Sequence, residues 1–427
     1  MAEATEHPHL AARINTRAVY VLYCLCLLAA HAGGLGIAPL MAIAGVIGLA
    51  TAAISQGRQG LDLGLKPARW MIALLLFLLW AAISASWSDY TAKGLSNPVK
   101  LLIGAVFYIF GMGAFFRAAK GVTKRGVGVI VIATFIAAIL LCLDTLTGYR
   151  LSMLVDPVGP NEDPISRLGD AQMNVSQGII MANLVFAPIA TLLLWTQRRG
   201  PWMVAALIIL NITAAVAGGI MAGVLALVLT ITAMGFAAIR PTAVIKTLTY
   251  VSMGLVGFAP LFGALMGAVP QSVRDALPFS WEHRLVTWGY SAELTRAAPI
   301  RGHGFDASRT FNATFEARGF EGLAKISLHP HNAGLQIWLE TGAIGALLAV
   351  ITIFFIGQKA QDFASGGRAR AVAVAGTMAA VILIASVSYG VWQDWWWALI
   401  ALSTGLLGFV PKTRRNYAPI ASDKGKL

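Results

Sequence analysis

The chain has 427 residues, of which 57% are hydrophobic and only 12% are charged, and its mean hydropathy is +0.72. These values exclude an ordinary soluble globular protein and predict an all-α integral membrane protein, because helices satisfy their own backbone hydrogen bonds in lipid. The net charge of +13 is better explained by anionic lipid headgroups than by nucleic acid, since the sequence holds no nucleic-acid-binding module of interleaved basic and aromatic residues.

Apolar stretches long enough to cross a membrane follow one another along most of the chain. A spanning helix needs roughly 17 to 25 mainly apolar residues, and about twelve stretches meet this requirement. They cover approximately residues 18–33, 35–54, 70–87, 100–118, 126–147, 173–196, 202–217, 219–238, 247–268, 332–356, 370–389 and 392–410. The first pair, and the pair that meets near Gly218 and Gly219, are also compatible with broken or re-entrant hairpins. The polar first 17 residues do not resemble a cleavable signal peptide.

The distribution of Lys and Arg predicts the orientation. With the N-terminus inside, the inner segments carry 21 basic residues and the short outer loops carry four, namely Lys93, Lys100, Arg150 and Arg167. Both termini are therefore expected in the cytoplasm, and the long segment 269–331 is expected outside by parity. The predicted organisation is nine transmembrane helices in residues 1–268, a large outer loop in 269–331, three helices in 332–410 and a basic tail in 411–427.

Few residues inside the predicted spans point to chemistry. Cys24, Cys26 and Cys142 have neither disulfide nor metal spacing and are expected as small core residues. Asp144 and Asp394 receive no role. Four tryptophans surround Asp394 in VWQDWWWAL, and they are expected to form an interfacial aromatic belt, with a wall on which ligand rings stack at the mouth of a cavity as the alternative.

The segment 269–331 is too long to be a simple connection and is expected to be an ordered functional loop. Its stretch SWEHRLVTWGYSAELTRAAPIRGHGF predicts an amphipathic helix with Leu285, Trp288 and Leu294 on the apolar side. Arg284 shares a face with Trp288. It is either a solvated or acid-paired residue of a surface helix, or a guanidinium aimed at a phosphate, whose oxygens match its donors.

The loop ends in HPHNAGLQIWLETGAIG, from His329 to Gly345. Pro330 disfavours a helical His329, so a helix is expected to start around His331 with Asn332 near its cap. A helix N-terminus depresses the pKa of a nearby imidazole and keeps it neutral, as a general base requires. The alternative is an ordinary capping histidine. Glu340 lies inside the following span and is either functional or a structural pair with another buried polar group.

These residues resemble a known family. His331 and Asn332, nine further residues, and then Gly342 and Gly345 are similar to the motif of bacterial O-antigen ligases and the related O-antigen polymerases. About twelve spans, one large outer loop before the motif and Arg284 shortly before Trp288 fit the same layout, as does the tryptophan-serine turn in AISASWSDYTAKGL. The resemblance implies a GT-C-like polytopic architecture in the inner membrane of a Gram-negative bacterium.

The resemblance also implies an activity. An O-antigen ligase transfers a glycan from undecaprenyl diphosphate to a sugar hydroxyl of lipid A-core on the periplasmic side, with inversion and without a metal or other cofactor. In this chain His331 would be the general base and Arg284 would stabilise the departing diphosphate. Asn332, His329, His303, Trp288 and Glu340 are expected to support the site.

One departure from the family concerns a second cation. Family members commonly carry a serine-arginine-glycine-type motif at the outer end of a middle span, whereas this chain reads AGGIMAGVLALVL with Met221 in the arginine's place. Arg167 is the first candidate to replace it, the alternative being a loop-ordering residue paired with Asp163 or Asp170. Arg301 and Arg309 are further candidates for binding the diphosphate.

Three other functions are compatible with the sequence. A polymerase of O-antigen or exopolysaccharide would use the same donor with a second lipid-linked repeat as acceptor. A transporter of lipid-linked glycans would have a similar size, but it would not need a long loop that ends in a histidine motif, and no inverted repeat is visible. A non-catalytic assembly protein would explain the missing arginine.

Overall fold

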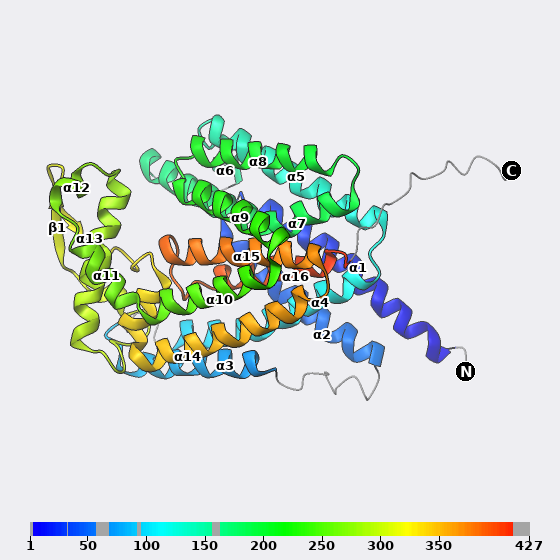
Figure 1. Cartoon of the computed structure of the whole chain (residues 1–427), viewed down its shortest axis with the longest axis horizontal. Helices are drawn as coiled ribbons and strands as arrows, with labels where there is room; N and C mark the ends of the chain where they lie inside the picture. The colour runs from blue at the N-terminus through cyan, green and yellow to red at the C-terminus, as the bar shows by residue number, and fades with distance from the viewer. Residues whose placement is uncertain (1–2, 32, 57–67, 92–94, 156–162, 413–427) are drawn as a thin grey trace.

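The protein is helical almost throughout. The computed structural model describes residues 3–31, 33–56, 68–91, 95–155 and 163–412. Its long helices lie side by side as a bundle (Figure 1). In chain order they are α1 (Glu3–Ala29), α2 (Ile37–Gln56), α3 (Arg69–Ser84), α4 (Ser96–Lys120), α5 (Lys124–Leu146), α7 (Pro164–Thr196), α8 (Gly200–Ala217), α9 (Met221–Ile239), α10 (Pro241–Gly257), α14 (Ala333–Ala364), α15 (Arg368–Val387) and α16 (Asp394–Leu406).

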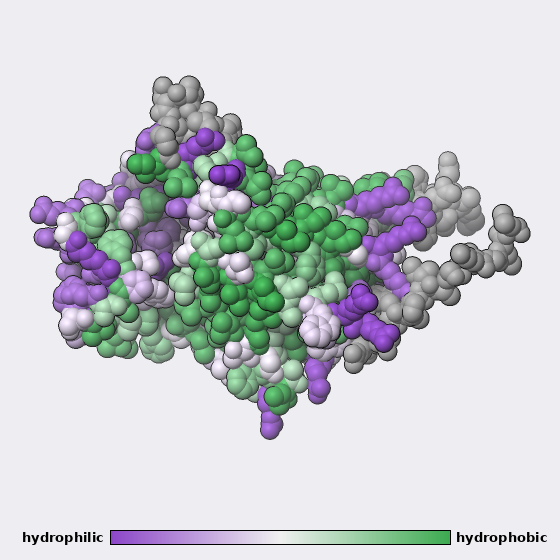
Figure 2. Space-filling model, turned by 90° about the horizontal axis from the view of Figure 1, so that it is seen from above, coloured by the Kyte–Doolittle hydropathy of each residue, from purple (hydrophilic) through white to green (hydrophobic). Residues whose placement is uncertain are grey.

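The surface of the bundle is that of a membrane protein. On the face that Figure 2 shows, hydrophobic residues cover a broad band across the middle, and hydrophilic residues gather toward the two ends. Ten helices of the described ranges are long and apolar enough to cross a membrane. An eleventh span arises if α10 and α11 (Ala259–Gly267), which meet at an angle of 67°, are taken together.

The expected number of about twelve spans stays a prediction. Each of the twelve predicted stretches contains a helix, but the last one holds only the 13 residues of α16, followed by the 3-10 turn Leu407–Phe409. The two doubtful pairs are ordinary separate helices, α1 with α2 and α8 with α9. The break lies instead at Phe258, between α10 and α11.

Two helices form the centre of the bundle. In α7, 83% of the most apolar stretch of the helix is buried inside the protein, and in α15 the corresponding share is 61%. Small residues allow this close packing, because a β-carbon at Gly376 of α15 would lie 2.6 Å from the Ala187 β-carbon of α7. Cys26 and Cys142 are buried and Cys24 is partly buried, and all three are free, as expected for small core residues.

The tryptophan cluster belongs to this core, so the prediction of an interfacial aromatic belt was wrong. Trp392, Trp395 and Trp396 are 8%, 2% and 3% exposed, and Trp395 and Trp396 pack inside the main hydrophobic cluster. The sequence pattern misled because an aromatic belt and a turn between two packed helices both place tryptophans at the end of a span.

The long segment 269–331 is folded and covers one end of the bundle, and it is called the cap below. It consists of α12 (Gln271–Asp275), α13 (Phe279–Ala297), the 3-10 turn η4 (Ala307–Thr310) and an antiparallel hairpin of β1 (Thr314–Ala317) with β2 (Phe320–Ala324). The amphipathic helix was predicted correctly, since Leu285 and Trp288 of α13 are buried. Figure 1 places this cap opposite the end of the bundle from which α1 starts.

Candidate active site

A break in α14 fixes the cap to the bundle. Gly342 lies inside α14 with φ 64° and ψ −165°, a conformation open almost only to glycine. The break frees backbone carbonyls that a continuous helix would use. The Leu339 carbonyl accepts a hydrogen bond from the His303 amide at 2.9 Å, and the Glu340 carbonyl accepts one from the Gly304 amide at 2.8 Å. Gly342, the first glycine of the motif, therefore creates the backbone acceptors that bind the loop at His303 and Gly304.

A tryptophan of α3, Trp80, also binds the backbone of α14 at this break. The indole of Trp80 donates to the Thr341 carbonyl at 3.0 Å. Beyond the break, the Ala343 amide donates to the Pro299 carbonyl at 2.9 Å. The loop, α3 and both halves of α14 are thus held by backbone groups that the kink makes available.

Replacing Gly342 by alanine is expected to destabilise the protein by about 1–3 kcal/mol, because a β-carbon is strained at this φ and would meet the Ile300 backbone. The melting temperature in detergent should fall by several degrees. Gly235→Ala is the control, since Gly235 is helical and a β-carbon there meets nothing within 4 Å. Equal melting of the two variants would contradict the role of the break.

Glu340 joins three segments around the break. Its side chain is fully buried and accepts hydrogen bonds from the Asp306 amide at 2.8 Å, from the Ser308 amide and hydroxyl, from Gln336 at 3.2 Å and from the Trp392 indole. Every oxygen of the carboxylate has partners. The structural interpretation of Glu340 is therefore favoured: it orders the loop next to the histidine motif and has no free lone pair aimed at a ligand.

The candidate base and the candidate cation meet at the C-terminal end of α15. The last carbonyls of a helix have no partner within the helix and carry partial negative charge. Here the Ser386 carbonyl accepts from the Asn332 amide group at 3.0 Å, and the Val387 carbonyl accepts from Arg284 Nε at 2.8 Å. The Ser388 carbonyl accepts from His331 Nδ1. Three consecutive carbonyls thus position Asn332, Arg284 and His331 together.

His331 has the geometry that a general base needs. It lies just before α14 with φ 53°, a left-handed conformation that is uncommon for residues other than glycine. Asn332 is the N-cap of α14, as predicted, and accepts from the Leu335 amide at 2.9 Å. Because Nδ1 donates to Ser388, the proton of the neutral ring is on Nδ1, and Nε2 keeps its lone pair.

His329 supports this arrangement. Its Nδ1 accepts from the His331 amide at 3.2 Å, and the two rings lie edge to face with centroids 4.4 Å apart. Burial lowers the pKa of His329, and the charges of His331 and Arg309 lower it further. Burial is also the main cause that lowers the pKa of His331. The hydrogen bond to Ser388 opposes it, and the charge of Arg284 adds to it. Both rings are neutral near pH 7.

Arg284 is a half-buried arginine on α13, as the sequence predicted. Besides Val387 it donates to the Ser280 carbonyl at 2.7 Å, and its guanidinium lies 5.5 Å from the Trp281 ring centroid. None of the ion pairs among the described residues includes Arg284, so its charge is available for an anion. Trp288 of the same helix donates to the Pro330 carbonyl at 3.0 Å and fixes α13 to the histidine motif.

The other candidate residues have structural partners. His303 donates through Nε2 to the Leu294 carbonyl at 2.9 Å, so it ties the loop to α13. Arg301 lies 5.7 Å from the Trp87 ring centroid, and Arg309 lies 5.7 Å from that of Tyr90. The tryptophan-serine turn holds the same loop, since Trp87 and Ser88 donate to loop carbonyls at 3.2 and 2.8 Å.

The hydrogen bond that Arg167 makes ties it to a short helix in another part of the chain. Its Nη2 donates to the Met153 carbonyl of α6 (Arg150–Val155) at 2.6 Å, and among the described residues it pairs with neither Asp163 nor Asp170. No described contact joins it to His331. Met221 begins α9, and its neighbour Ala222 packs against the apolar cluster that contains Val387. The residue after the place of the expected arginine thus packs on the same apolar cluster as Val387, whose carbonyl binds Arg284.

Asp144 and Asp394, to which the sequence assigned no role, each stabilise local structure. Asp144 is fully buried and accepts from the Leu151 amide at 2.8 Å and the Ser152 amide at 3.0 Å, which orders the start of α6. Asp394 forms an ion pair with Lys100 at 2.6 Å. Within the described ranges, no three His, Cys, Asp or Glu side chains gather closely enough to hold a metal ion.

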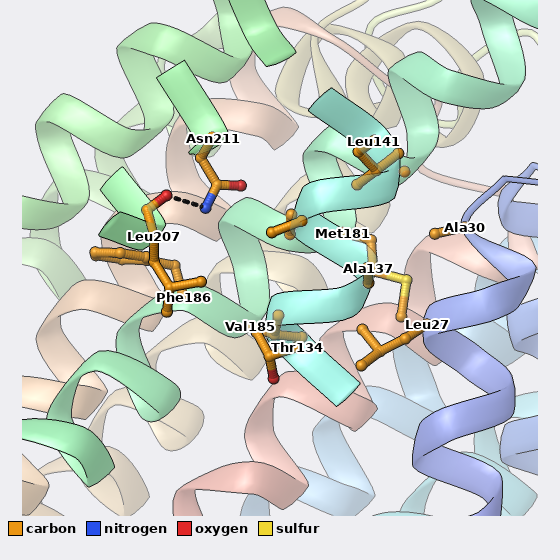
Figure 3. A pocket seen from close by; sticks show the side chains of 13 residues that line it. Leu27, Ala30, Thr134, Ala137, Leu141, Met181, Val185, Phe186, Leu207 and Asn211 are labelled. Carbon is orange, nitrogen blue, oxygen red and sulfur yellow. Dashed lines mark hydrogen bonds between the residues drawn. The ribbon is translucent and has the colours of Figure 1, made fainter. Parts of the chain in front are cut away.

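A cavity inside the bundle is a separate feature. It lies among α1, α5, α7 and α8, is lined mainly by apolar side chains and has a volume of about 10 Å³ (Figure 3). That space holds at most about one water molecule. The one amide drawn there, Asn211, donates to the Leu207 carbonyl of its own helix at 2.8 Å. The cavity is a packing defect and not a substrate site.

Comparison with known proteins gives two findings. A sequence model of the family described as O-antigen ligase matches residues 175–350, which include α9, α13 and the histidine motif. Two bacterial proteins, each named "Putative polysaccharide ligase", are also similar. The one from Rickettsia prowazekii is 30% identical over 174 residues, covering 37% of this chain and 42% of that protein. The one from Rickettsia typhi is 32% identical over 130 residues, covering 28% and 31%. The chain thus spans less than half the length of either relative.

Proposed function

Because the family match and both relatives confirm the resemblance to the O-antigen ligase family, we propose that this protein transfers a glycan from undecaprenyl diphosphate to a sugar hydroxyl. The acceptor that we propose is lipid A-core, as in the ligases of that family. One observation carries the proposal: neighbouring carbonyls at the end of α15 position a histidine and an arginine, and among the described residues the histidine Nε2 has no hydrogen-bond partner and the arginine has no acidic partner.

The chemistry follows from these two groups. As the acceptor oxygen forms its bond to the anomeric carbon, Nε2 of His331 takes the hydroxyl proton. The bond between that carbon and the diphosphate oxygen breaks, and Arg284 stabilises the negative charge that develops on the leaving group. Attack from the side opposite the leaving group inverts the anomeric centre. The diphosphate leaves as an anion, so the reaction needs no proton from a second residue.

We further propose that the cap lies in the periplasm and that both termini lie in the cytoplasm. Two observations support this orientation. The basic residues of the short connections gather on the side of the termini, and α1 starts at the end of the bundle opposite the cap (Figure 1). A multi-pass protein of the Gram-negative inner membrane would then meet the lipid-linked glycan on the outer face, where the acceptor also lies.

Activity is expected to be constant through neutral pH and to fall only in acid. A base with a lowered pKa is lost when pH drops through that lowered value, because protonation occupies Nε2. The kcat/KM profile should therefore begin to fall below the ordinary histidine value of about 6.5. Melting temperatures along the same pH series control for unfolding. A half-maximal rate at or above about pH 6.5 would contradict a buried neutral His331.

The acceptor decides between a ligase and a polymerase, which share the donor chemistry. Purified protein is incubated with carrier-linked radiolabelled glycan and either lipid A-core or unlabelled carrier-linked repeat. The proposal predicts labelled lipid A-core. Elongated carrier-linked glycan without labelled lipid A-core would replace the ligase by the polymerase, and transport into vesicles without any transfer would exclude both enzymes.

A further inference from the structure

The Arg309 guanidinium has an ion-pair partner and an aromatic neighbour, but no hydrogen-bond partner among the described residues. Arg309 belongs to η4, and its side chain is 29% exposed. Its Nε lies 3.4 Å from Asp306 Oδ1. The two groups form an ion pair, but their geometry is not that of a hydrogen bond. Among the described residues the guanidinium makes no hydrogen bond at all. A mostly buried arginine with free N–H groups is a donor set that an anion can use.

The loop around Arg309 is rigidly held. Asp306 receives a hydrogen bond from Asn97 of α4 at 3.2 Å, and its own amide donates to Glu340 at 2.8 Å. Ser308, directly before Arg309, also donates to Glu340. The position of Arg309 is therefore set by α4 and α14 together, so little ordering is needed when a ligand binds.

A chain of contacts links the loop that carries Arg309 to His329. Glu340 accepts from Gln336, and Gln336 accepts from the Val391 amide at 2.8 Å. The preceding Gly390 packs on His329, since a β-carbon there would lie 2.9 Å from the imidazole. The charge of Arg309 contributes to the lowered pKa of His329, which agrees with this link.

Tyr90 adds a flat apolar surface to the cation. Its ring centroid lies 5.7 Å from the Arg309 guanidinium, and the ring comes from the connection after α3 that also carries Trp87. A sugar ring presents C–H groups of slightly positive charge, which pack on the negative face of an aromatic ring. Because the guanidinium lies over the ring, a cation and an aromatic surface are held together, and this combination suits a sugar that bears an anionic group better than a bare diphosphate.

We propose that Tyr90 and Arg309 form a subsite beside His329 for the acceptor sugar, and that this subsite selects a sugar carrying a phosphate or carboxylate. The inference rests on the proposed function, in which Arg284 serves the donor diphosphate. It gives the site two cations with different partners, one on α13 for the leaving group and one on η4 for the acceptor.

Steady-state kinetics can distinguish an effect of Arg309 on acceptor binding from an effect on donor binding. Arg309→Gln should raise KM for a phosphorylated acceptor by about 10- to 100-fold, the value of one or two charge-assisted hydrogen bonds. KM for the same acceptor after phosphatase treatment, and KM for the donor, should change less than about twofold. Arg309→Lys should restore part of the loss. Arg296→Gln, an exposed arginine near the end of α13, is the matched control. A raised donor KM, an equal rise for both acceptors, or no rise would each overturn the proposal.

Binding tests the subsite without turnover. Wild-type protein in detergent should be stabilised against heat by glucose 6-phosphate more than by glucose, because a ligand of the native state raises its melting temperature. Arg309→Gln should remove this preference and should keep stabilisation by inorganic pyrophosphate, while Tyr90→Leu should weaken both sugars. Equal stabilisation of the wild type by the two sugars would overturn the subsite even if transfer activity is found. The reverse pattern, sugar phosphate preference without transfer, would leave the subsite and remove the enzyme.

Discussion

Replacing His331 by asparagine is expected to lower kcat by about 10²- to 10⁴-fold, the usual contribution of a general base. The asparagine amide can still donate to the Ser388 carbonyl, as Nδ1 does, but it has no counterpart of Nε2. The variant should therefore fold and bind both substrates. Turnover with purified donor and acceptor, measured together with the melting temperature, checks this expectation.

A comparison with alanine sharpens the result. His331→Ala loses both ring nitrogens, so it should be as inactive as His331→Asn and also less stable. If His331→Asn retains turnover near the wild-type value while His331→Ala is inactive, the histidine acts only through its hydrogen bond to Ser388. That outcome would remove His331 from proton transfer.

Replacing Arg284 by glutamine is expected to lower kcat by about 10²- to 10³-fold, which is typical for the loss of one group that stabilises developing negative charge. Lysine at this position should recover part of the rate, because it keeps the charge and loses the fork that matches phosphate oxygens. Since the anion is fully developed only as the bond breaks, the loss should fall on kcat more than on the KM of the acceptor.

Arg284 also holds the Val387 carbonyl, so its structural contribution needs a control. Arg296→Gln changes the same residue type on the same helix and should leave turnover within about twofold. Inorganic pyrophosphate should inhibit the wild type and the Arg296 variant equally and the Arg284→Gln variant much less. Equal inhibition of all three would show that Arg284 does not bind the leaving group.

The fold was predictable where apolar length decides it. Every predicted stretch contains a helix, because a run of apolar residues has no other stable structure in lipid. The break at Phe258 and the short α16 were not predictable, since hydropathy measures length and cannot sense a change of direction within an apolar run. The hairpin of β1 and β2 was also missed, because it lies in a loop whose sequence shows no clear alternation.

The local structure around the candidate residues was predictable from the sequence, but the groups that hold those residues in place were not. The cap at Asn332 followed from Pro330 and helix-start chemistry, and α13 followed from its amphipathic pattern. The partners of His331 and Arg284 are backbone carbonyls of α15, and such groups leave no trace in a sequence because every residue has one. The neighbours of Arg309 and Arg167 were equally hidden, since both are set by tertiary structure. The motif glycine was visible, but only its φ and ψ show why it is needed.

The most direct test of the proposed enzyme uses purified wild-type protein and His331→Asn in detergent, with carrier-linked glycan and lipid A-core and without nucleotide sugar or ATP. The measurement is the glycan found on lipid A-core together with the undecaprenyl diphosphate released. The wild type should yield both in equal amounts, with an inverted glycosidic linkage, and the variant should yield neither within the time of many wild-type turnovers. Absence of transfer by the wild type, or equal transfer by the two proteins, would contradict a glycosyltransferase in which His331 is the base.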